Sequence, residues 1–279
     1  MPFFRGFKQV VLVKQVPDLT AGHVPIKPDG TIDRSKVRPM FNPSDLSALE
    51  AALDLKDRMG GMIFPLSMGP PDAEQVLRDC YLAGTDYHYL LTDRRLGGSD
   101  TLGTSYALAQ AVRYIESQWG PVDVVHSGIK ALDGETGQVG PQVARWLSRP
   151  CLPYVEEVLD IDLTKEKPLH AALIITGGTA RVRSPLPCVV VDAPTKYSLR
   201  TPYASRLLNA GGFKMEMLNI DQIDCVVPFI GVDLSPTKVW KSEPQTSAEG
   251  FRQTRVLTPD QIPQLVDKWG KMGLFKQEA

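Results

Sequence analysis

Short apolar runs alternate with segments of helical periodicity over the first 150 residues of the chain. The apolar runs have the length of buried strands, whereas the intervening segments repeat apolar residues every three or four positions. This alternation is typical of an α/β fold with a Rossmann-like parallel sheet and right-handed crossovers. The candidate strands are 10–16, 62–68, 87–91 and 121–125. The candidate helices open near Asn42, Asp72, Asp100 and Val139.

The first candidate helix carries signals for both of its ends. Asn42-Pro43-Ser44-Asp45 favours a start with Ser44 or Asp45 as the cap, and Gly60-Gly61 favours an end. Ahead of this helix, residues 24–33 alternate around Pro28-Asp29-Gly30, which indicates a small hairpin.

The pattern changes after Pro150. Strand-like segments now follow one another without helices between them, which predicts an antiparallel extension of the sheet. These segments are 152–163, 173–176, 180–183 and 187–192. A short helix or loop is expected at 201–212, and a less regular tail from 215 onward.

The C-terminal part has many prolines and few core-forming runs, with one helix expected over about 260–272. Trp240, Phe251 and Trp269 would form an exposed apolar surface if this part were free in solvent. We therefore expect an α/β domain over residues 1–227 and a C-terminal arm over residues 228–279 that packs on another chain.

A glycine-rich loop follows the strand that ends near residue 125. Its four glycines let the backbone pass close to a ligand, and the N–H groups of the following helix favour an anion such as a nucleotide phosphate. Lys130 supplies a cation, and Asp133 and Thr136 are candidate caps for that helix. The alternative is a plain helix cap whose glycines serve the turn alone. The spacing is neither the dinucleotide-binding fingerprint nor a Walker A loop.

Several other loops reach the same edge of the expected sheet. Ligands of open parallel sheets bind at the carboxyl ends of the strands. The segments that reach this edge are Val13-Lys14, Asn42–Asp45, Met68-Gly69, Asp100–Ser105 and Gly128–Val139. Their convergence favours a nucleotide site over an isolated turn.

Composition narrows the class of protein. A net charge of −1 gives no basic surface on average, which argues against nucleic acid as the main partner. The four cysteines are scattered, so we expect no metal site and no disulfide framework, and a cytoplasmic location. No apolar run is long enough for a membrane helix or a signal peptide.

Several spaced motifs, in order, are similar to one family. Val13-Lys14-Gln15-Val16-Pro17-Asp18, Asn42-Pro43-Ser44-Asp45 and Ser67-Met68-Gly69-Pro70 resemble the β subunit of electron transfer flavoprotein. The Lys27–Gly30 turn and the glycine-rich loop at 128–141 fit the same pattern. The similarity runs from about residue 8 to the Gly231-Val-Asp-Leu segment and more faintly beyond it.

The resemblance implies an α/β fold of the adenine nucleotide α-hydrolase-like type, with a C-terminal arm. It implies a heterodimer with an α subunit that moves electrons through FAD. Respiratory members hold a structural AMP in the β subunit, with the single FAD in the α subunit. Flavin-bifurcating members hold a second FAD there, and NADH binds beside it.

This chain is more similar to the bifurcating type. Residues 97–105 resemble the G-x-D-T-x-A-T-S pattern of those relatives, and residues 133–141 resemble D-G-D-T-A-Q-V-G-P. Gly103 and Gly137 stand where alanine is usual, which predicts intact binding with altered flavin packing. The implied function is electron transfer between NADH or an acyl-CoA dehydrogenase and a further acceptor, by bifurcation or confurcation. The alternatives are an AMP-holding respiratory subunit and a nucleotide-binding sensor module without redox work.

The resemblance implies cofactor contacts but no acid, base or nucleophile, because the flavin carries the chemistry. Lys14 either neutralises a phosphate or is a solvated strand end, and Asn42 either bonds adenine or ribose or serves the turn. Asp100, Thr101 and Thr104 either contact the flavin or cap their helix. The implied cofactor residues are Leu12, Val13, Lys14, Asn42, Pro43, Ser44, Asp45, Met68, Gly69, Asp100, Thr101, Thr104, Gly128, Lys130, Ala131, Asp133, Thr136, Gly137, Gln138 and Val139.

A docking loop is also implied. Family members anchor a partner dehydrogenase with a leucine after Tyr-Ala-Ser/Thr, whereas here Tyr203-Ala204-Ser205 is followed by Arg206. The candidate docking residues are Tyr203, Leu207 and Leu208, and either the anchor is shifted or the partner differs. An acyl-CoA dehydrogenase is the expected partner, with a quinone reductase as a further one.

Overall fold

The computed structural model describes residues 6–18, 36–162, 168–194, 198–232, 235–237 and 258–272. The expected hairpin at 24–33 and the side chains of Trp240 and Phe251 lie outside these ranges. The chain divides into two compact units, residues 1–240 and residues 241–279. The packing of an arm on another chain stays a prediction.

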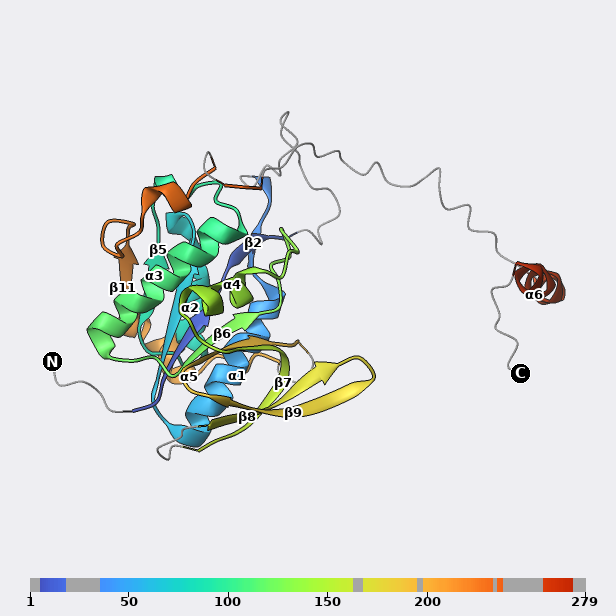
Figure 1. Ribbon diagram of the computed structural model, residues 1–279, viewed down its shortest axis with the longest axis horizontal. Coiled ribbons are helices and arrows are strands. Elements are labelled where there is room, and N and C mark those ends of the chain that lie inside the picture. The colour runs from blue at the N-terminus through green and yellow to red at the C-terminus, as the bar shows by residue number, and fades with distance from the viewer. Residues whose placement is uncertain are drawn as a thin grey trace. The chain divides into compact units, whose positions relative to one another are not determined.

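The first unit is built on a twisted sheet that has nine strands in its described part, in the order β11-β5-β4-β1-β6-β10-β7-β8-β9 (Figure 1). From β11 to β7 all neighbouring strands are parallel, and β8 and β9 are added antiparallel. The strands are β1 (Lys8–Leu12), β4 (Met62–Met68), β5 (His88–Leu91), β6 (Val124–Gly128), β7 (Cys151–Ile161), β8 (Pro168–Ile175), β9 (Gly178–Pro185), β10 (Cys188–Asp192) and β11 (Met215–Leu218). A separate antiparallel pair joins β2 (Gln15–Pro17) to β3 (Pro39–Phe41).

Helices cover both faces of this sheet because alternate residues of each central strand point to opposite sides. Val10 of β1 lies in one buried cluster with residues of α3 and α4, whereas Val11 lies in a second cluster with residues of α1 and α2. The helices are α1 (Pro43–Met59), α2 (Glu74–Ala83), α3 (Thr101–Trp119), α4 (Val139–Trp146), α5 (Ala204–Leu208) and, in the second unit, α6 (Ile262–Lys271). The expected α/β fold is thus confirmed.

The extension after Pro150 is only partly antiparallel. Strands β8 and β9 confirm the prediction, but β10 lies between β6 and β7 and is parallel to both. The sequence Cys-Val-Val-Val-Asp explains the difference, because all five residues of β10 are buried. A continuous apolar run of this kind is typical of a strand covered on both faces. The prediction also missed β11, a four-residue edge strand parallel to β5.

The first turn of α1 also differs from the prediction. Its N-cap is Asn42, and no side-chain hydrogen bond caps it among the described residues, so the assignment of Ser44 or Asp45 as the cap was wrong. The predicted end at Gly60 is confirmed. At α3, by contrast, Asp100 is the N-cap, and its carboxylate accepts a hydrogen bond from the Gly103 N–H at 3.0 Å.

His88 at the start of β5 makes the fold sensitive to acid. It is fully buried, with Nδ1 2.7 Å from the Lys214 carbonyl and Nε2 2.8 Å from the Thr85 hydroxyl. A carbonyl only accepts, so Nδ1 carries the proton and Nε2 accepts from Thr85. Burial lowers the pKa of His88 to about 4.

We therefore expect the free energy of unfolding to fall as the pH drops from about 6.5 toward 4, because the unfolded chain binds the proton more tightly. The loss attributable to His88 is about 2 kcal/mol between about pH 7.5 and pH 5. Urea unfolding of the wild type and of His88→Gln measures this loss, since the variant lacks the titrating ring. Equal pH dependence of the two proteins would contradict the assignment.

Candidate functional site

The candidate site lies at the carboxyl ends of β1, β4 and β6, where α1, α3 and α4 begin; we call this edge of the sheet the rim. The structure brings Lys14, Asn42, Asp45 and the loop at 128–138 together on the rim, as the sequence predicts. Met68 ends β4 at the same edge and Gly69 follows it, and Leu12 and Val13 are buried at the end of β1. The direct ligand contacts of these residues stay predictions.

Asn42 connects the end of β1 to the glycine-rich loop. Its side-chain Nδ2 donates to the Lys130 carbonyl at 3.0 Å, and its Oδ1 accepts from the Leu132 N–H at 3.1 Å. Its backbone N–H donates to the Lys14 carbonyl at 2.9 Å. Since Asn42 is only 1% exposed, its amide fixes the path of residues 130–132.

Gly128 allows the loop to pass directly against α1. A Cβ atom at this position would lie 2.4 Å from Asp45 Oδ1 and 2.7 Å from the backbone carbon of Ser44. Backbone atoms cannot move away as a flexible side chain can, so the close approach requires glycine here. The structure thus gives Gly128 a role in packing the loop on α1, and the predicted close approach of the loop to a ligand stays a prediction.

Asp45 is a buried carboxyl group beneath the loop. Its Oδ2 accepts a hydrogen bond from the Lys14 backbone N–H at 2.8 Å. Burial raises the pKa of Asp45 to about 7, although hydrogen bonds from Asn42 and Lys14 and the Lys14 charge oppose the shift. The negative charge of Asp133 raises this pKa further. The rim thus contains a carboxyl group that titrates near neutrality.

Lys14 and Asp133 form an ion pair with Nζ and Oδ1 2.7 Å apart. The Lys14 side chain is 41% exposed and the Asp133 side chain 2% exposed. The prediction that Asp133 or Thr136 caps the following helix was wrong, because the N-cap of α4 is Gln138 and no side chain caps it in the described part of the chain. Asp133 instead holds the loop against the end of β1, and the Lys14 ammonium group still reaches solvent.

Lys130 makes a second ion pair on the loop, with Glu135 Oε1 at 2.8 Å. Both side chains are largely exposed, so the pair contributes little to stability and its cation can turn toward an anionic ligand. Ala131 is half-buried in the same loop, and Thr136 is exposed.

The first turns of α3 and α4 meet at the rim. Thr101 Oγ1 donates to Gln138 Oε1 at 2.8 Å, which connects the two helix starts. Thr104 and Val139 lie in these first turns. Two helix N-termini directed to one place favour the binding of an anion.

The two glycines expected to alter flavin packing have backbone roles in this chain. Gly137 has a φ of 65°, in the left-handed region where a side chain is strained. A Cβ on Gly103 would lie 2.9 Å from the Phe229 carbonyl oxygen. Glycine is therefore favoured at position 137 by the backbone conformation and at position 103 by the close Phe229 carbonyl oxygen.

Sequence reasoning missed three polar residues at the rim. The Ser67 hydroxyl, at the end of β4, is buried and has no hydrogen-bond partner among the described residues. Ser235 and Thr237 bond to Asp100 at the start of α3. Ser67 stands within a recognised motif, but Ser235 and Thr237 lie more than 130 residues from Asp100 in sequence, so no local pattern predicts their contacts.

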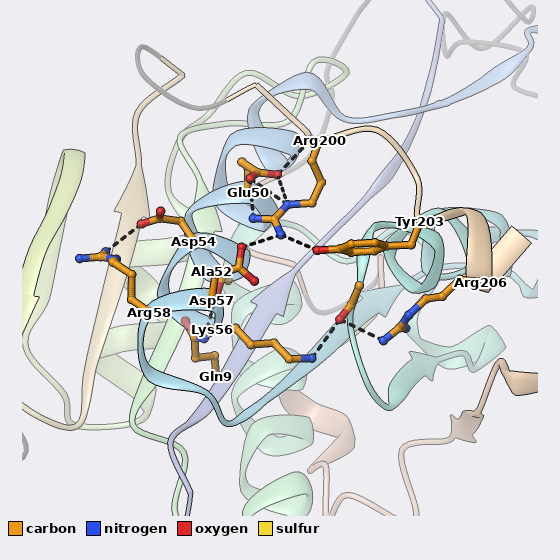
Figure 2. A network of polar contacts seen from close by, with 11 residues as sticks. Gln9, Glu50, Ala52, Asp54, Lys56, Asp57, Arg58, Arg200, Tyr203 and Arg206 are labelled. Atoms are coloured by element: carbon orange, nitrogen blue, oxygen red, sulfur yellow. Dashed lines mark hydrogen bonds and ion pairs between the residues drawn. The ribbon is translucent and has the colours of Figure 1, made fainter.

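The candidate docking residues lie away from the rim, on and before α5. Figure 2 shows Arg200 between Glu50 and Tyr203, with Arg206 directed into the domain. Arg206 donates to the carbonyl oxygens of Tyr81 and Gly84 at the end of α2, and its guanidinium lies 4.8 Å from the centre of the Tyr81 ring. Leu207 is 56% exposed and Leu208 90% exposed. The residue after Tyr-Ala-Ser is thus used for anchoring α5, and the leucines face solvent.

Among the described residues, no cluster of three or more potential metal ligands is found. No helix in the described part of the chain has both the length and the apolar character needed to cross a membrane.

Comparison with known proteins agrees with this geometry. A family model for the electron transfer flavoprotein domain matches residues 29–206, and the chain therefore belongs to the electron transfer flavoprotein family. Within the family it is of the β-subunit type.

Three relatives illustrate this placement. The protein FixA of Sinorhizobium fredii is 43% identical over 82% of this chain and 80% of its own length. The electron transfer flavoprotein subunit beta of Clostridium acetobutylicum is 37% identical over 84% of this chain and 86% of its own length. The caffeyl-CoA reductase-Etf complex subunit CarD of Acetobacterium woodii is 35% identical over 84% of this chain and 86% of its own length.

Proposed function

We propose that this chain pairs with an α subunit and holds FAD at the rim, from which electrons pass between NADH and an acyl-CoA-dependent redox partner. The observation that carries this proposal is the preformed loop at 128–138. Asn42 and Lys14 fix it from one side, and the first turn of α3 contacts it from the other. A fixed loop with two partly exposed lysines, Lys14 and Lys130, beside two helix N-termini suits the diphosphate of a dinucleotide.

The residues of the rim have binding and orienting roles in this proposal. Gly128 lets the loop lie close to α1, and Lys14, beside the loop, and Lys130, within it, provide positive charge. Thr101 and Gln138 position the helix starts. When bound, FAD supplies the hydride and electron chemistry, so no side chain is assigned as an acid, base or nucleophile.

FAD is favoured over AMP by the motifs at 97–105 and 133–141, which resemble those of bifurcating relatives. The relative from Acetobacterium woodii is by name a subunit of a reductase–Etf complex. The alternative is a structural AMP, which would use the same Lys14, Asn42 and Gly128 region because both ligands share the adenylate group. Electron bifurcation or confurcation is the corresponding activity of the FAD-containing form.

Reduction by NADH tests the proposed redox role. The heterodimer with its α subunit is mixed anaerobically with NADH, and flavin absorbance is followed with and without an acyl-CoA dehydrogenase and its enoyl-CoA substrate. The proposal predicts bleaching by NADH alone and electron transfer to the dehydrogenase. A heterodimer that the dehydrogenase reduces but NADH does not would contradict direct exchange with NADH.

The docking surface makes a separate prediction. We propose that Leu208 is the anchor for the partner dehydrogenase, because it is the most exposed of the three candidates and its helix is fixed by Arg200 and Arg206. Leu208→Ala is expected to raise the KM for the dehydrogenase about tenfold or more, as truncation of an interface anchor does. Ile175→Ala is the control, because Ile175 on β8 is a side chain of the same size that is also exposed, at 51%. Equal KM values for both variants would exclude Leu208.

The second unit supports the proposed role of the arm. Helix α6 begins after a capping box formed by Thr258 and Gln261. Ile262, Val266 and Trp269 recur on one side of it and are exposed. An amphipathic helix of this kind is typical of a segment that packs on a partner, and we propose the α subunit as that partner.

A further inference from the structure

The chain leaves the sheet domain through a segment that crosses the start of α3. We call residues 226–232 and 235–237 the exit segment, because they lead from the domain toward the C-terminal unit. The Val226 N–H donates to the Tyr106 hydroxyl at 3.2 Å, and the Gly231 N–H donates to Ser99 Oγ at 2.8 Å. The exit segment is therefore attached both to α3 and to the turn before it.

Asp100 is the centre of these contacts. Its backbone N–H donates to Ser235 Oγ at 2.9 Å, and the same hydroxyl donates to the Gly231 carbonyl at 2.8 Å. One carboxylate oxygen of Asp100 accepts from the Gly103 N–H, and the other accepts from Thr237 Oγ1 at 2.8 Å. The backbone N–H and both carboxylate oxygens of Asp100 thus bond to α3 or to the exit segment. Ser235 is only 8% exposed.

Close backbone approaches accompany these hydrogen bonds. The Gly103 Cβ position would lie 2.9 Å from the Phe229 carbonyl, and the Gly98 Cβ position would lie 2.8 Å from Val232 Cβ. Gly98 has a φ of 73°, which also favours glycine. The exit segment thus packs on two glycines that flank Asp100, which leaves little room for it to shift alone.

The same helix start reaches the nucleotide loop. Thr101, the residue after Asp100, donates to Gln138 at the N-cap of α4. A continuous set of contacts therefore runs from Thr237 through Asp100 and Thr101 to Gln138. Such a chain of packed and hydrogen-bonded groups is what energetic coupling between two places requires.

We propose that Ser235 and Thr237 are positioning residues of the nucleotide site, which hold the start of α3 through Asp100 and thereby couple the exit segment to cofactor binding. The inference rests on the proposed nucleotide site at the rim. Coupling is reciprocal, so nucleotide binding should also order the exit segment. In this proposal Asp100 influences the nucleotide site by holding the first turn of α3 in place.

Hydrogen exchange of the full heterodimer tests this coupling. The nucleotide-depleted complex is compared with and without added FAD, and with AMP as a second probe. We expect slower exchange in three regions on binding, namely residues 128–139, 98–105 and 229–237. Protection of 128–139 with no change at 229–237 would overturn the coupling and leave the nucleotide site intact. No protection at 128–139 with either probe would instead contradict the proposed function.

Thr237 variants supply the second measurement. Thr237→Val removes the hydroxyl at nearly constant shape and is expected to weaken nucleotide binding by up to about tenfold, because the start of α3 loses a contact through which the exit segment holds it. Thr237→Ser keeps the hydroxyl but loses the methyl group, and it should retain wild-type affinity. If Thr237 acted only by filling space, Thr237→Ser would lower the affinity and Thr237→Val would not. Thr179→Val on the exposed edge of β9 is the matched control. Wild-type affinity of Thr237→Val would overturn the assignment.

Discussion

Gly128→Ala is expected to weaken nucleotide binding at the rim strongly while the chain still assembles its sheet. The added methyl group would overlap Asp45 Oδ1 and the backbone of Ser44. Overpacking of this kind costs about 1–3 kcal/mol, and relief requires the loop to move away from α1. Because the loop then loses its bonds to Asn42, we expect nucleotide affinity to fall about 100-fold, equivalent to ~3 kcal/mol. Equilibrium titration of the nucleotide-depleted heterodimer measures this loss.

Gly134→Ala is the matched control for this variant. Gly134 lies in the same loop, but a Cβ there would meet nothing within 4 Å, and the substitution is chemically identical. We expect wild-type affinity from Gly134→Ala. If both variants bind nucleotide equally well, the close approach at Gly128 does not define the site. If both variants lose nucleotide affinity equally, binding requires a flexible loop, and the close approach of Gly128 to α1 does not explain the loss.

Asp45→Asn is expected to change how stability depends on pH. Burial raises the pKa of Asp45 from the ordinary 3.8 to about 7, so the folded protein holds this proton more tightly than the unfolded chain. The stability that the protonated carboxyl provides is therefore lost as the pH rises from about 4 to about 7. The full shift corresponds to about 4 kcal/mol, of which about 2–3 kcal/mol falls between pH 5 and pH 8.

An asparagine keeps an oxygen for the Lys14 N–H but does not titrate. The stability of Asp45→Asn relative to wild type should therefore rise by about 2–3 kcal/mol from pH 5 to pH 8. Urea unfolding of the nucleotide-free protein at both pH values gives this difference, and the opposite contribution of His88 cancels because both proteins contain it. Asp86→Asn, which removes a carboxylate paired with Lys56, is measured alongside as the control for the loss of one negative charge. A constant difference for Asp45→Asn would contradict the assigned pKa.

The fold could largely be predicted from the sequence because its strands are continuous apolar runs. Val10, Val11, Phe64 and Leu66 are buried on both sides of the sheet. The prediction for β10 was wrong because it rested on the lack of helices between the segments after Pro150, although the buried apolar run of β10 is typical of a strand covered on both faces. β11 was missed because it has only four residues, and one of them is buried.

The rim could be predicted because parallel strands end at one edge, but the side-chain roles within it could not. Asn42, Asp45 and Asp133 are residue types that cap helices, and local sequence favoured that role for Asp45 and Asp133. The structure uses them across long sequence distances instead, as in the pair of Lys14 with Asp133. Such pairs depend on how the chain folds back, which no local spacing records. Arg206 is a similar case, because its partners on α2 lie far from it in sequence.

The cofactor content of the heterodimer tests the central claim most directly. The chain is co-purified with its α subunit, the nucleotides are released with acid, and FAD and AMP are quantified by chromatography. The proposed function predicts two FAD molecules per heterodimer and little AMP, with the second FAD lost in Gly128→Ala and retained in Gly134→Ala. One FAD and one AMP per heterodimer would contradict an FAD at the rim and identify the site as a structural AMP site.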